Sequence, residues 1–184
     1  EAVRWPNVAF STGRSWSEVA RGYHAIVERA VDVEAVGELA LAAAAGESDR
    51  RRIVAACVAA LRGKLRYAGI EFGASAVVPV GPRTALARGY GDCKDQAAFL
   101  VSMLRALGIP ATLALLEPGP GEDVNEALPG IGGFGHAIVH VPGDPPLWVD
   151  TTDPYTPVGE LPLPDQGRLA LIASAATTGL VRTP

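Results

Sequence analysis

Hydrophobic and polar positions follow a helical period near the start of the chain. From Ser15 to about Ala30, apolar side chains recur three or four residues apart on one stripe. The segment opens with Ser15-Trp16-Ser17-Glu18, which matches a capping box in which Ser15 accepts from a backbone N–H and Glu18 reaches back. The pattern predicts a helix from Ser15 to about Ala30.

Two further helices are expected before the pattern changes. Alanine-rich sequence predicts one over about 34–45, ended by Gly46, a residue favoured just after a helix. Ser48 or Asp49 then caps another over about 50–64, where apolar positions again recur at the spacing of a buried stripe.

The next segment changes from helical to extended character. Residues 66–72 carry strand-forming side chains and precede a loop rich in glycine and proline. A short helical turn is expected over 84–88. A longer helix then opens within Gly91-Asp92-Cys93 and ends at about Leu107.

Strand patterns dominate the last third of the chain. The sequence predicts strands over 111–117, 136–141 and 147–151, and an edge strand over 169–173. Between the first two lies a long loop, 118–135, expected to be flexible and to border any active site. Helices first and strands later, with one helix between, predict an α+β fold with an antiparallel sheet.

Composition limits the organisation and the partners. The chain has 184 residues, 48% of them hydrophobic, which predicts one globular domain over 1–184: a helical part over about 15–65 and a core over about 66–173. A net charge of −4, with no basic cluster longer than Arg50–Arg52, argues against nucleic-acid binding. Apolar runs are too short to cross a membrane, so no membrane contact is expected. Because the chain begins at Glu1 without a signal-peptide pattern, we expect a domain cut from a longer protein.

Two cysteines are too few for a disulfide scaffold, and zinc-binding motifs are missing, so neither a metal nor a cofactor is predicted. Cys57 lies in apolar sequence and is expected to be an inert core residue. Cys93 lies in the first turn of its helix among charged residues. Unsatisfied N–H groups there favour an anion, and such a position can lower a thiol pKa from about 8.5 into the range of roughly 3.5–7.5. A buried structural thiol is the alternative interpretation.

A histidine and an aspartate flank a predicted hairpin turn. If His136 lies directly opposite Asp150, their Cβ atoms are roughly 4.5–5.5 Å apart and the opposite face of the hairpin is wholly apolar. A register shifted by two residues would keep the same faces but change the partner of His136. An imidazole held by a carboxylate is what a cysteine nucleophile needs. His140, nearer the turn and expected to be solvated, and Asp153, in a following turn, are the competing residues. His24 is expected to be structural.

The segments GDCKDQAAFLVSMLRALGIPATLALL, GHAIVHV and LWVDTTDP, in this order, resemble the bacterial, papain-like branch of the transglutaminase-like superfamily. The resemblance covers roughly residues 16–173 and implies that branch's fold, with the nucleophile helix packed on the sheet. It also implies Cys93 as nucleophile, His136 as general base and acid, and Asp150 as the residue that orients the imidazole.

The resemblance leaves the oxyanion contacts less defined. The backbone N–H of Cys93 is one expected donor, and Tyr67 and Asp92 are candidates for oxyanion or substrate contacts. Asp92 stands where animal transglutaminases have glutamine, so their crosslinking specificity is not expected, nor is calcium dependence. His136 follows Cys93 by 43 residues, against roughly 130–150 in papain itself, which excludes a papain-type protease proper.

These expectations converge on a cysteine enzyme that forms a thioester with a peptide or protein substrate and resolves it with water or an amine. The alternative function is a catalytically silent module that binds a peptide or protein partner; a Cys/His/Asp metal site is a third possibility. The resemblance further implies flanking domains in the same chain and a periplasmic or extracellular location.

Overall fold

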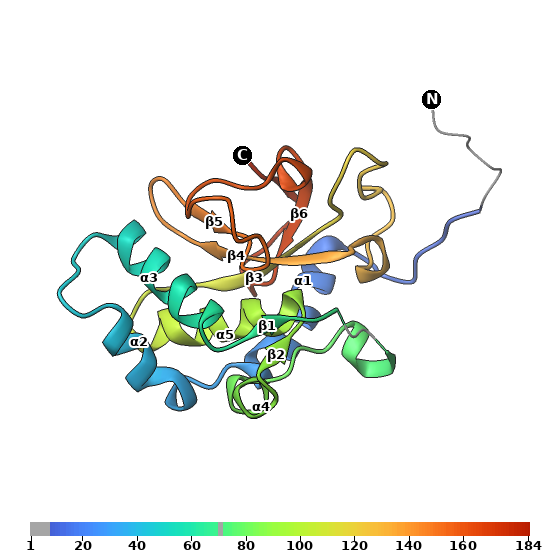
Figure 1. The fold of residues 1–184 in the computed structure, drawn as a ribbon. Helices are drawn as coiled ribbons and strands as arrows, with labels where there is room; N and C mark the ends of the chain where they lie inside the picture. Colours follow the sequence, from blue (N-terminus) through green and yellow to red (C-terminus); the bar gives the residue numbers. More distant parts are fainter. Residues whose placement is uncertain (1–7, 70–71) are drawn as a thin grey trace.

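The computed structural model describes residues 8–69 and 72–184, and it shows helices packed against one face of a curled antiparallel sheet (Figure 1). The predicted α+β class is therefore confirmed. The strands follow the order β5-β4-β3-β6-β7. They are β3 (Thr112–Leu116), β4 (His136–Val141), β5 (Leu147–Val149), β6 (Leu169–Ile172) and β7 (Val181–Arg182).

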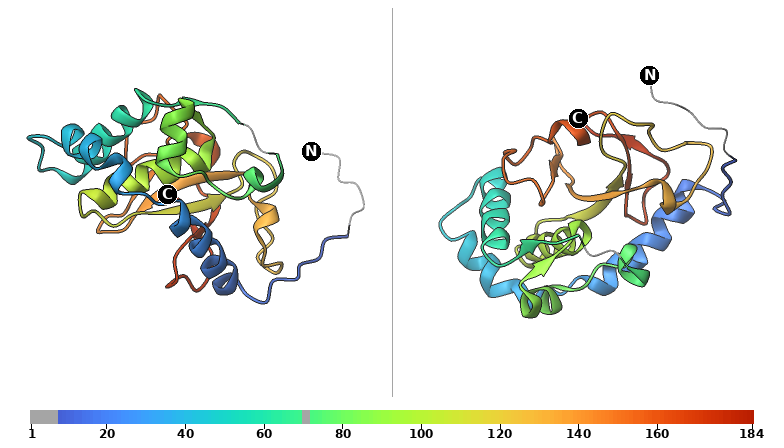
Figure 2. Two further views of the ribbon diagram at one scale, coloured as in Figure 1. Left: turned by 90° about the horizontal axis from the view of Figure 1, so that it is seen from below. Right: turned by 45° about the vertical axis from the view of Figure 1, so that its right-hand side comes forward.

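Helix α5 (Cys93–Ala106) is the centre of the core. It packs on β3 and β4 on one side and against the other helices on the other, and every residue from Cys93 to Leu104 is buried. Figure 2 shows this layering from two further directions. The surrounding helices are α1 (Trp16–Ala30), α2 (Gly37–Ala43), α3 (Arg50–Arg62) and α4 (Pro82–Arg88).

The helix starts follow the side chains that satisfy free backbone donors. Ser15 accepts from the Glu18 N–H at 3.2 Å, as predicted, but the Glu18 carboxylate accepts from Arg14 instead of Ser15, so the expected capping box is only half formed. Of the two alternatives for α3, Asp49 is the cap, accepting from the Arg52 N–H at 2.9 Å.

Several predicted boundaries were wrong. The helix expected over 34–45 is a 3₁₀ turn (Glu34–Val36) followed by the shorter α2, and α3 ends at Arg62. Of the strand expected over 66–72, β1 (Arg66–Tyr67) forms and pairs in parallel with β2 (Tyr90–Gly91); residues 70 and 71 lie outside the described residues. The run expected to be an edge strand is β6, which lies between β3 and the unpredicted β7.

The sheet is buried on both faces. Ala137, Val139 and Val141 join the main core beneath α5, whereas Ile138 and Trp148 belong to a second cluster with Leu161 on the opposite face. Leu161 comes from the segment after β5, which crosses this outer face. That segment therefore runs close to the strand that begins at His136.

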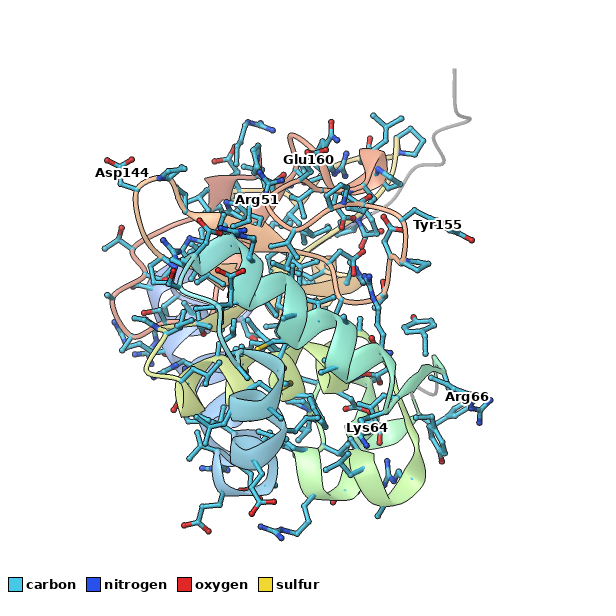
Figure 3. The ribbon with its side chains drawn as sticks, turned by 60° about the vertical axis from the view of Figure 1, so that its left-hand side comes forward. Arg51, Lys64, Arg66, Asp144, Tyr155 and Glu160 are labelled. Carbon is cyan, nitrogen blue, oxygen red and sulfur yellow. The ribbon has the colours of Figure 1, made fainter. Side chains whose placement is uncertain are left out.

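Arginines of α3 hold the segment after β5 in place. Arg51 donates to the carbonyl of Val158 and lies 3.6 Å from Glu160. Figure 3 labels the side chains of Arg51 and Glu160. At the last residue of the same helix, Arg62 donates to the carbonyls of Thr151 and Asp153. The helical layer thus fixes the stretch of chain that carries the acidic residues described below.

None of the described helices is long and apolar enough to span a membrane.

Candidate active site

Cys93 is the first residue of α5, and the residue before it caps the helix. The Asp92 carboxylate accepts from the Asp95 N–H at 3.1 Å, and the Asp95 carboxylate accepts from the Asp92 N–H at 3.3 Å, so a full capping box forms here. The positive end of the helix dipole in this first turn favours negative charge beside the Cys93 sulfur.

The turn into α5 needs glycine at position 91. A Cβ there would lie 2.8 Å from the Cβ of Asp95, closer than two such atoms can pack. Asp95 also accepts from the Val80 N–H at 2.8 Å, which ties the preceding loop to the start of the helix. Asp95 therefore packs closely on Gly91 and also binds the loop at Val80, which holds that loop against the first turn of α5.

A buried ion pair lies beside the thiol. Lys94 and Asp92 are 4% and 2% exposed, and their charged groups are in direct contact. Leaving either partner alone in this setting would cost several kcal/mol, because an unpaired buried charge is poorly solvated. Asp92, a candidate for oxyanion or substrate contact, has its carboxylate engaged in this pair and in the helix cap.

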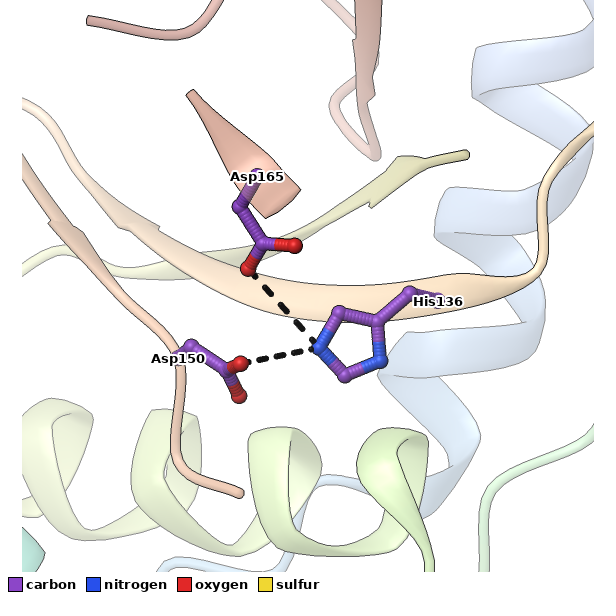
Figure 4. Close-up of side chains that lie close together, drawn as sticks. All are labelled: His136, Asp150 and Asp165. Carbon is purple, nitrogen blue, oxygen red and sulfur yellow. Dashed lines mark ion pairs between the residues drawn. The ribbon is translucent and has the colours of Figure 1, made fainter. Parts of the chain in front are cut away.

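His136 and Asp150 lie together. Nε2 of His136 is 3.1 Å from Oδ2 of Asp150, and their side chains are 13% and 6% exposed (Figure 4). The other carboxylate oxygen, Oδ1, accepts from the N–H and the hydroxyl of Thr152, both at 2.8 Å. Asp150 is thus held by Thr152 on one side while it binds the imidazole on the other.

The hairpin reaches this contact through a different register from the one expected. The strands pair Val141 with Leu147 and Val139 with Val149, two residues away from the register that places His136 opposite Asp150. The physical reason is that Pro146 and the proline before it lack the N–H that a ladder requires, so pairing starts only at Leu147. Because the shift is even, the predicted faces are right, and Asp150 reaches His136 from beyond the end of its strand.

The His136 imidazole also forms a hydrogen bond with Cys93. Burial alone would lower the pKa of His136, but hydrogen bonds to Asp150 and Cys93, and the negative charges of both, outweigh it and raise that pKa to about 10. Burial likewise favours a protonated Asp150, yet the bonds from His136 and Thr152 hold the pKa of this carboxyl below its usual value. The arrangement favours a charged imidazole beside the Asp150 carboxylate.

A small cavity opens at this point. It has about 70 Å³ of space open to water, and Cys93 and His136 both line it although Cys93 is only 4% exposed. The loop over 118–135 borders it, as expected, through the 3₁₀ turn Ile131–Gly133 and the residues that follow. Six apolar side chains also line the cavity: Ala76, Val77, Leu115, Ile131, Phe134 and Ala137.

That loop is tethered rather than free of the body. The Arg168 guanidinium donates to the carbonyls of Glu117, Gly121 and Glu122, and Trp16 donates from its indole N–H to the carbonyl of Glu126 at 2.8 Å. The glycine and proline content of this loop predicts flexibility, but these long-range hydrogen bonds hold the loop in place at the wall of the cavity.

Tyr23 is a cavity residue that the sequence analysis did not single out. It comes from α1, is 3% exposed and lines the cavity beside Cys93. Burial and the nearby negative charges of Cys93, Asp92 and Asp95 raise the pKa of its phenol. In the sequence, Tyr23 stands in the apolar stripe of α1, a position that indicates burial in the core but no role in a site.

Asp165 is a second carboxylate near the imidazole and was also missed. Its Oδ2 lies 4.0 Å from Nε2 of His136, and the residue is 2% exposed. It stands in a 3₁₀ turn (Leu163–Asp165) of the segment that crosses the outer face of the sheet. No local sequence pattern links this turn to a strand that starts 29 residues earlier.

Other candidates lie elsewhere. Tyr67 is on β1, 52% exposed, and is not among the described residues that line the cavity. Cys57 is fully buried, as predicted, and burial raises its pKa to about 11. His140 was expected to be solvated but packs on Trp148 with ring centroids 4.7 Å apart, because its face of the hairpin is covered. His24 bonds the carbonyl of Ala173 at 3.1 Å, a structural role.

The model of the transglutaminase-like superfamily matches residues 38–152, a stretch that contains Cys93, His136 and Asp150. The chain belongs to this superfamily. The resemblance inferred from the three sequence motifs is thereby confirmed at the level of the family. No curated protein matches the chain.

Two solved structures share the fold. A candidate protease from Parabacteroides distasonis superposes with a TM-score of 0.70 at 16% identity, covering 94% of this chain and 32% of the other. A candidate cysteine protease from Cytophaga hutchinsonii superposes with a TM-score of 0.52 at 15% identity, covering 85% and 50%. The transglutaminase-like chain described here therefore spans between a third and a half of the length of these proteins.

One set of described side chains has spacing that a metal ion could also use. The ligand atoms of His136, Asp150 and Asp165 lie within 4.8 Å of one another. The His136 imidazole is already hydrogen-bonded to Asp150 and to Cys93. Hydrogen bonds therefore account for the contacts of the imidazole in this group without a metal ion.

Proposed function

We propose that this chain is a cysteine hydrolase or acyltransferase that acts on amide bonds of a peptide or protein through a Cys93 thioester. The observation that carries the proposal is the bonded series Cys93, His136 and Asp150 at the wall of a cavity. Membership in the transglutaminase-like superfamily and the fold shared with a candidate cysteine protease support it.

In the first half-reaction, the Cys93 thiolate attacks the carbonyl carbon of the amide. A carbon–sulfur bond forms and the carbonyl π electrons move to oxygen. As the intermediate collapses, the carbon–nitrogen bond breaks and the leaving amine takes the proton from the His136 imidazolium. A thioester on Cys93 and a free amine result.

The second half-reaction returns the thiolate. The neutral His136 takes a proton from water, or from an acceptor amine, as that nucleophile attacks the thioester carbonyl. The carbon–sulfur bond breaks, giving a carboxylic acid or a new amide, and Cys93 leaves as a thiolate beside the imidazolium. Asp150 stabilises that imidazolium and keeps Nε2 of the ring occupied, so the other ring nitrogen serves Cys93.

The oxyanion needs donors on the cavity side. The backbone N–H of Cys93 belongs to the first residue of α5, at the positive end of the helix dipole, and it is the first donor. Tyr23 is the second: its hydroxyl belongs to a residue that lines the same cavity as Cys93, and a phenol of raised pKa keeps its proton to donate. Tyr67 and Asp92, the candidates from sequence, are not among the described residues that line this cavity.

Trapping the acyl-enzyme tests the proposal. The purified chain is incubated with a mixed peptide library, quenched in acid and digested, and mass spectrometry locates any acyl group. We expect a thioester on Cys93, no adduct in Cys93→Ala, and a normal adduct in Cys57→Ser, the matched control for losing a thiol.

The absence of any adduct and of any released amine, across peptide and amine acceptors, would instead support a silent module of the same fold. An adduct on Cys57 would contradict the assignment of the nucleophile. Zinc bound at one equivalent by the purified chain would favour the metal site.

A further inference from the structure

Asp165 lies against the catalytic histidine but takes no part in the mechanism above. Its Oδ2 is 4.0 Å from Nε2 of His136, on the same side of the ring as Asp150 (Figure 4). The residue is 2% exposed, and Oδ2 has no hydrogen-bond partner among the described residues.

A buried carboxylate oxygen without a donor is costly. An ionised carboxylate can only accept, and leaving it unpaired away from water costs roughly 1–3 kcal/mol or more. A protonated carboxyl has an O–H to donate, and then needs an acceptor. Asp150 supplies one: its carboxyl group lies within 4.8 Å of that of Asp165, and a side-chain hydrogen bond between the two favours the protonated form of Asp165.

We propose that Asp165 is a positioning residue: it shares a proton with Asp150 and thereby fixes the carboxylate that holds His136. Two carboxyl groups in one buried site cannot both ionise freely, so one retains the proton. Asp150 is bonded to the imidazole and to Thr152 and is the ionised member. Asp165, without such bonds, is the protonated one.

The charges around Asp165 agree with this division. Burial raises the pKa of its carboxyl to about 6; the imidazolium of His136 opposes the rise, while Asp150 and Asp153 add to it. Below this pH the pair shares one proton. Above it, two negative charges flank the imidazolium, which strengthens the charged ring and its hold on the Cys93 thiolate. The inference thus predicts a pH-dependent adjustment of the triad and rests on the proposed function for its catalytic meaning.

The test uses the whole chain and needs no substrate. Carboxyl-carbon NMR of protein labelled at aspartate follows each side-chain carboxyl with pH, and imidazole nitrogen NMR follows His136. Wild type is compared with Asp165→Asn, whose amide can still donate to Asp150, and with Asp165→Ala, which cannot. Asp153→Asn is the matched control for removing a nearby negative charge.

We expect one aspartate of the wild type to titrate near pH 6, with the His136 ring signals following the same midpoint. That signal is absent in Asp165→Asn and present in Asp153→Asn. At about pH 5, iodoacetamide alkylates Cys93 in Asp165→Asn within about twofold of the wild-type rate, whereas Asp165→Ala is about tenfold slower, since it loses one hydrogen bond to a charged group. Rescue by asparagine separates positioning from a merely structural role.

The inference is overturned if every aspartate of the wild type titrates below about pH 5, an observation that does not depend on how the variants fold. It is also overturned if the signal near pH 6 survives in Asp165→Asn or disappears in Asp153→Asn. One equivalent of bound zinc that Asp165→Asn loses would make the cluster a metal site instead. Because these readouts need no turnover, they stand even if no amide is cleaved.

Discussion

Oδ2 of Asp150 lies 3.1 Å from Nε2 of His136, while Oδ1 of the same carboxylate accepts two hydrogen bonds from Thr152. Both oxygens are therefore engaged, and the carboxylate cannot rotate without losing bonds on each side. A fixed anion at Nε2 keeps the imidazole oriented, and with Cys93 it raises the pKa of His136 to about 10. The thiol thus has a partner that stays protonated across the neutral range.

The first prediction concerns this anion. Asp150→Asn keeps the size of the side chain but removes the charge and offers a competing N–H, so the pKa of His136 falls and the ring is free to take the other tautomer. We expect turnover to drop about 10²–10⁴-fold, as for loss of the orienting aspartate in other triads. Alkylation of Cys93 at neutral pH, followed by mass spectrometry, should slow by about tenfold or more.

Asp144→Asn is the control for that variant, because Asp144 lies in the exposed hairpin turn between the same two strands. It should behave as wild type in both assays. Equal alkylation rates in Asp150→Asn and wild type would mean that the carboxylate does not influence the thiol through the imidazole.

The two cysteines should differ sharply in reactivity. Cys57 is fully buried in α3, and burial raises its pKa to about 11, so almost none of it is thiolate at neutral pH. Cys93 lines the cavity at a helix N-terminus. Near pH 7, a limited amount of iodoacetamide should modify Cys93 alone in the folded protein and both residues in urea, as read by peptide mapping. Modification of Cys57 in the folded state would contradict the environment described for it.

The close approach at the start of α5 gives the next prediction. Gly91→Ala would place a Cβ 2.8 Å from that of Asp95, so the capping box must shift. We expect the free energy of unfolding to fall by about 1–3 kcal/mol and Cys93 alkylation to slow. Gly22→Ala, on α1 where a new Cβ meets nothing within 4 Å, should instead be stabilising by about 0.5–1 kcal/mol in urea unfolding. If both substitutions changed the free energy of unfolding equally, the contact of the new Cβ with Asp95 would not be the cause of the destabilisation.

Much of this molecule is encoded locally, and those parts were predictable. β4 begins and ends where alternation placed it, and α5 starts at Cys93 because the capping residues stand next to it in the sequence. The apolar face of the hairpin predicted which side chains point the same way. It did not predict which residues pair, because Pro146 has no N–H to pair with and the strand pairing therefore starts only at Leu147.

The remaining parts of the site come from long-range packing. Tyr23 reaches the cavity from α1, and Asp165 reaches His136 from a 3₁₀ turn held partly by α3 and by the second apolar cluster. Neither residue stands in a pattern of its own: one occupies a hydrophobic stripe and the other a loop rich in proline. Their roles depend on which distant elements pack together, and a single sequence does not give that information.

Tyr23→Phe should separate the chemistry at the carbonyl from the reactivity of the thiol. Alkylation by iodoacetamide creates no oxyanion, so its rate at Cys93 should stay within about twofold of wild type. Formation of the acyl-enzyme does create one, and losing a donor should slow it by roughly 10²–10³-fold. Tyr155→Phe, whose side chain is 91% exposed, is the matched control and should change neither rate. A parallel loss of both rates in Tyr23→Phe would assign the phenol to packing around Cys93 rather than to the oxyanion.

The buried acid also predicts a pH dependence of stability. The pKa of Asp165 is about 6 in the folded protein, against about 3.9 for an unfolded aspartate. Below the unfolded value both states hold the proton and Asp165 costs nothing; as the pH rises to about 6, the unfolded chain releases its proton first, so the wild type loses stability. Asp165→Asn does not titrate and escapes this loss. The free energy of unfolding of Asp165→Asn, measured in urea, should therefore rise relative to that of the wild type by on the order of 2 kcal/mol between about pH 4 and pH 8. A difference between the two proteins that stays constant over that range would mean that Asp165 is ionised in the folded protein as easily as in the unfolded chain.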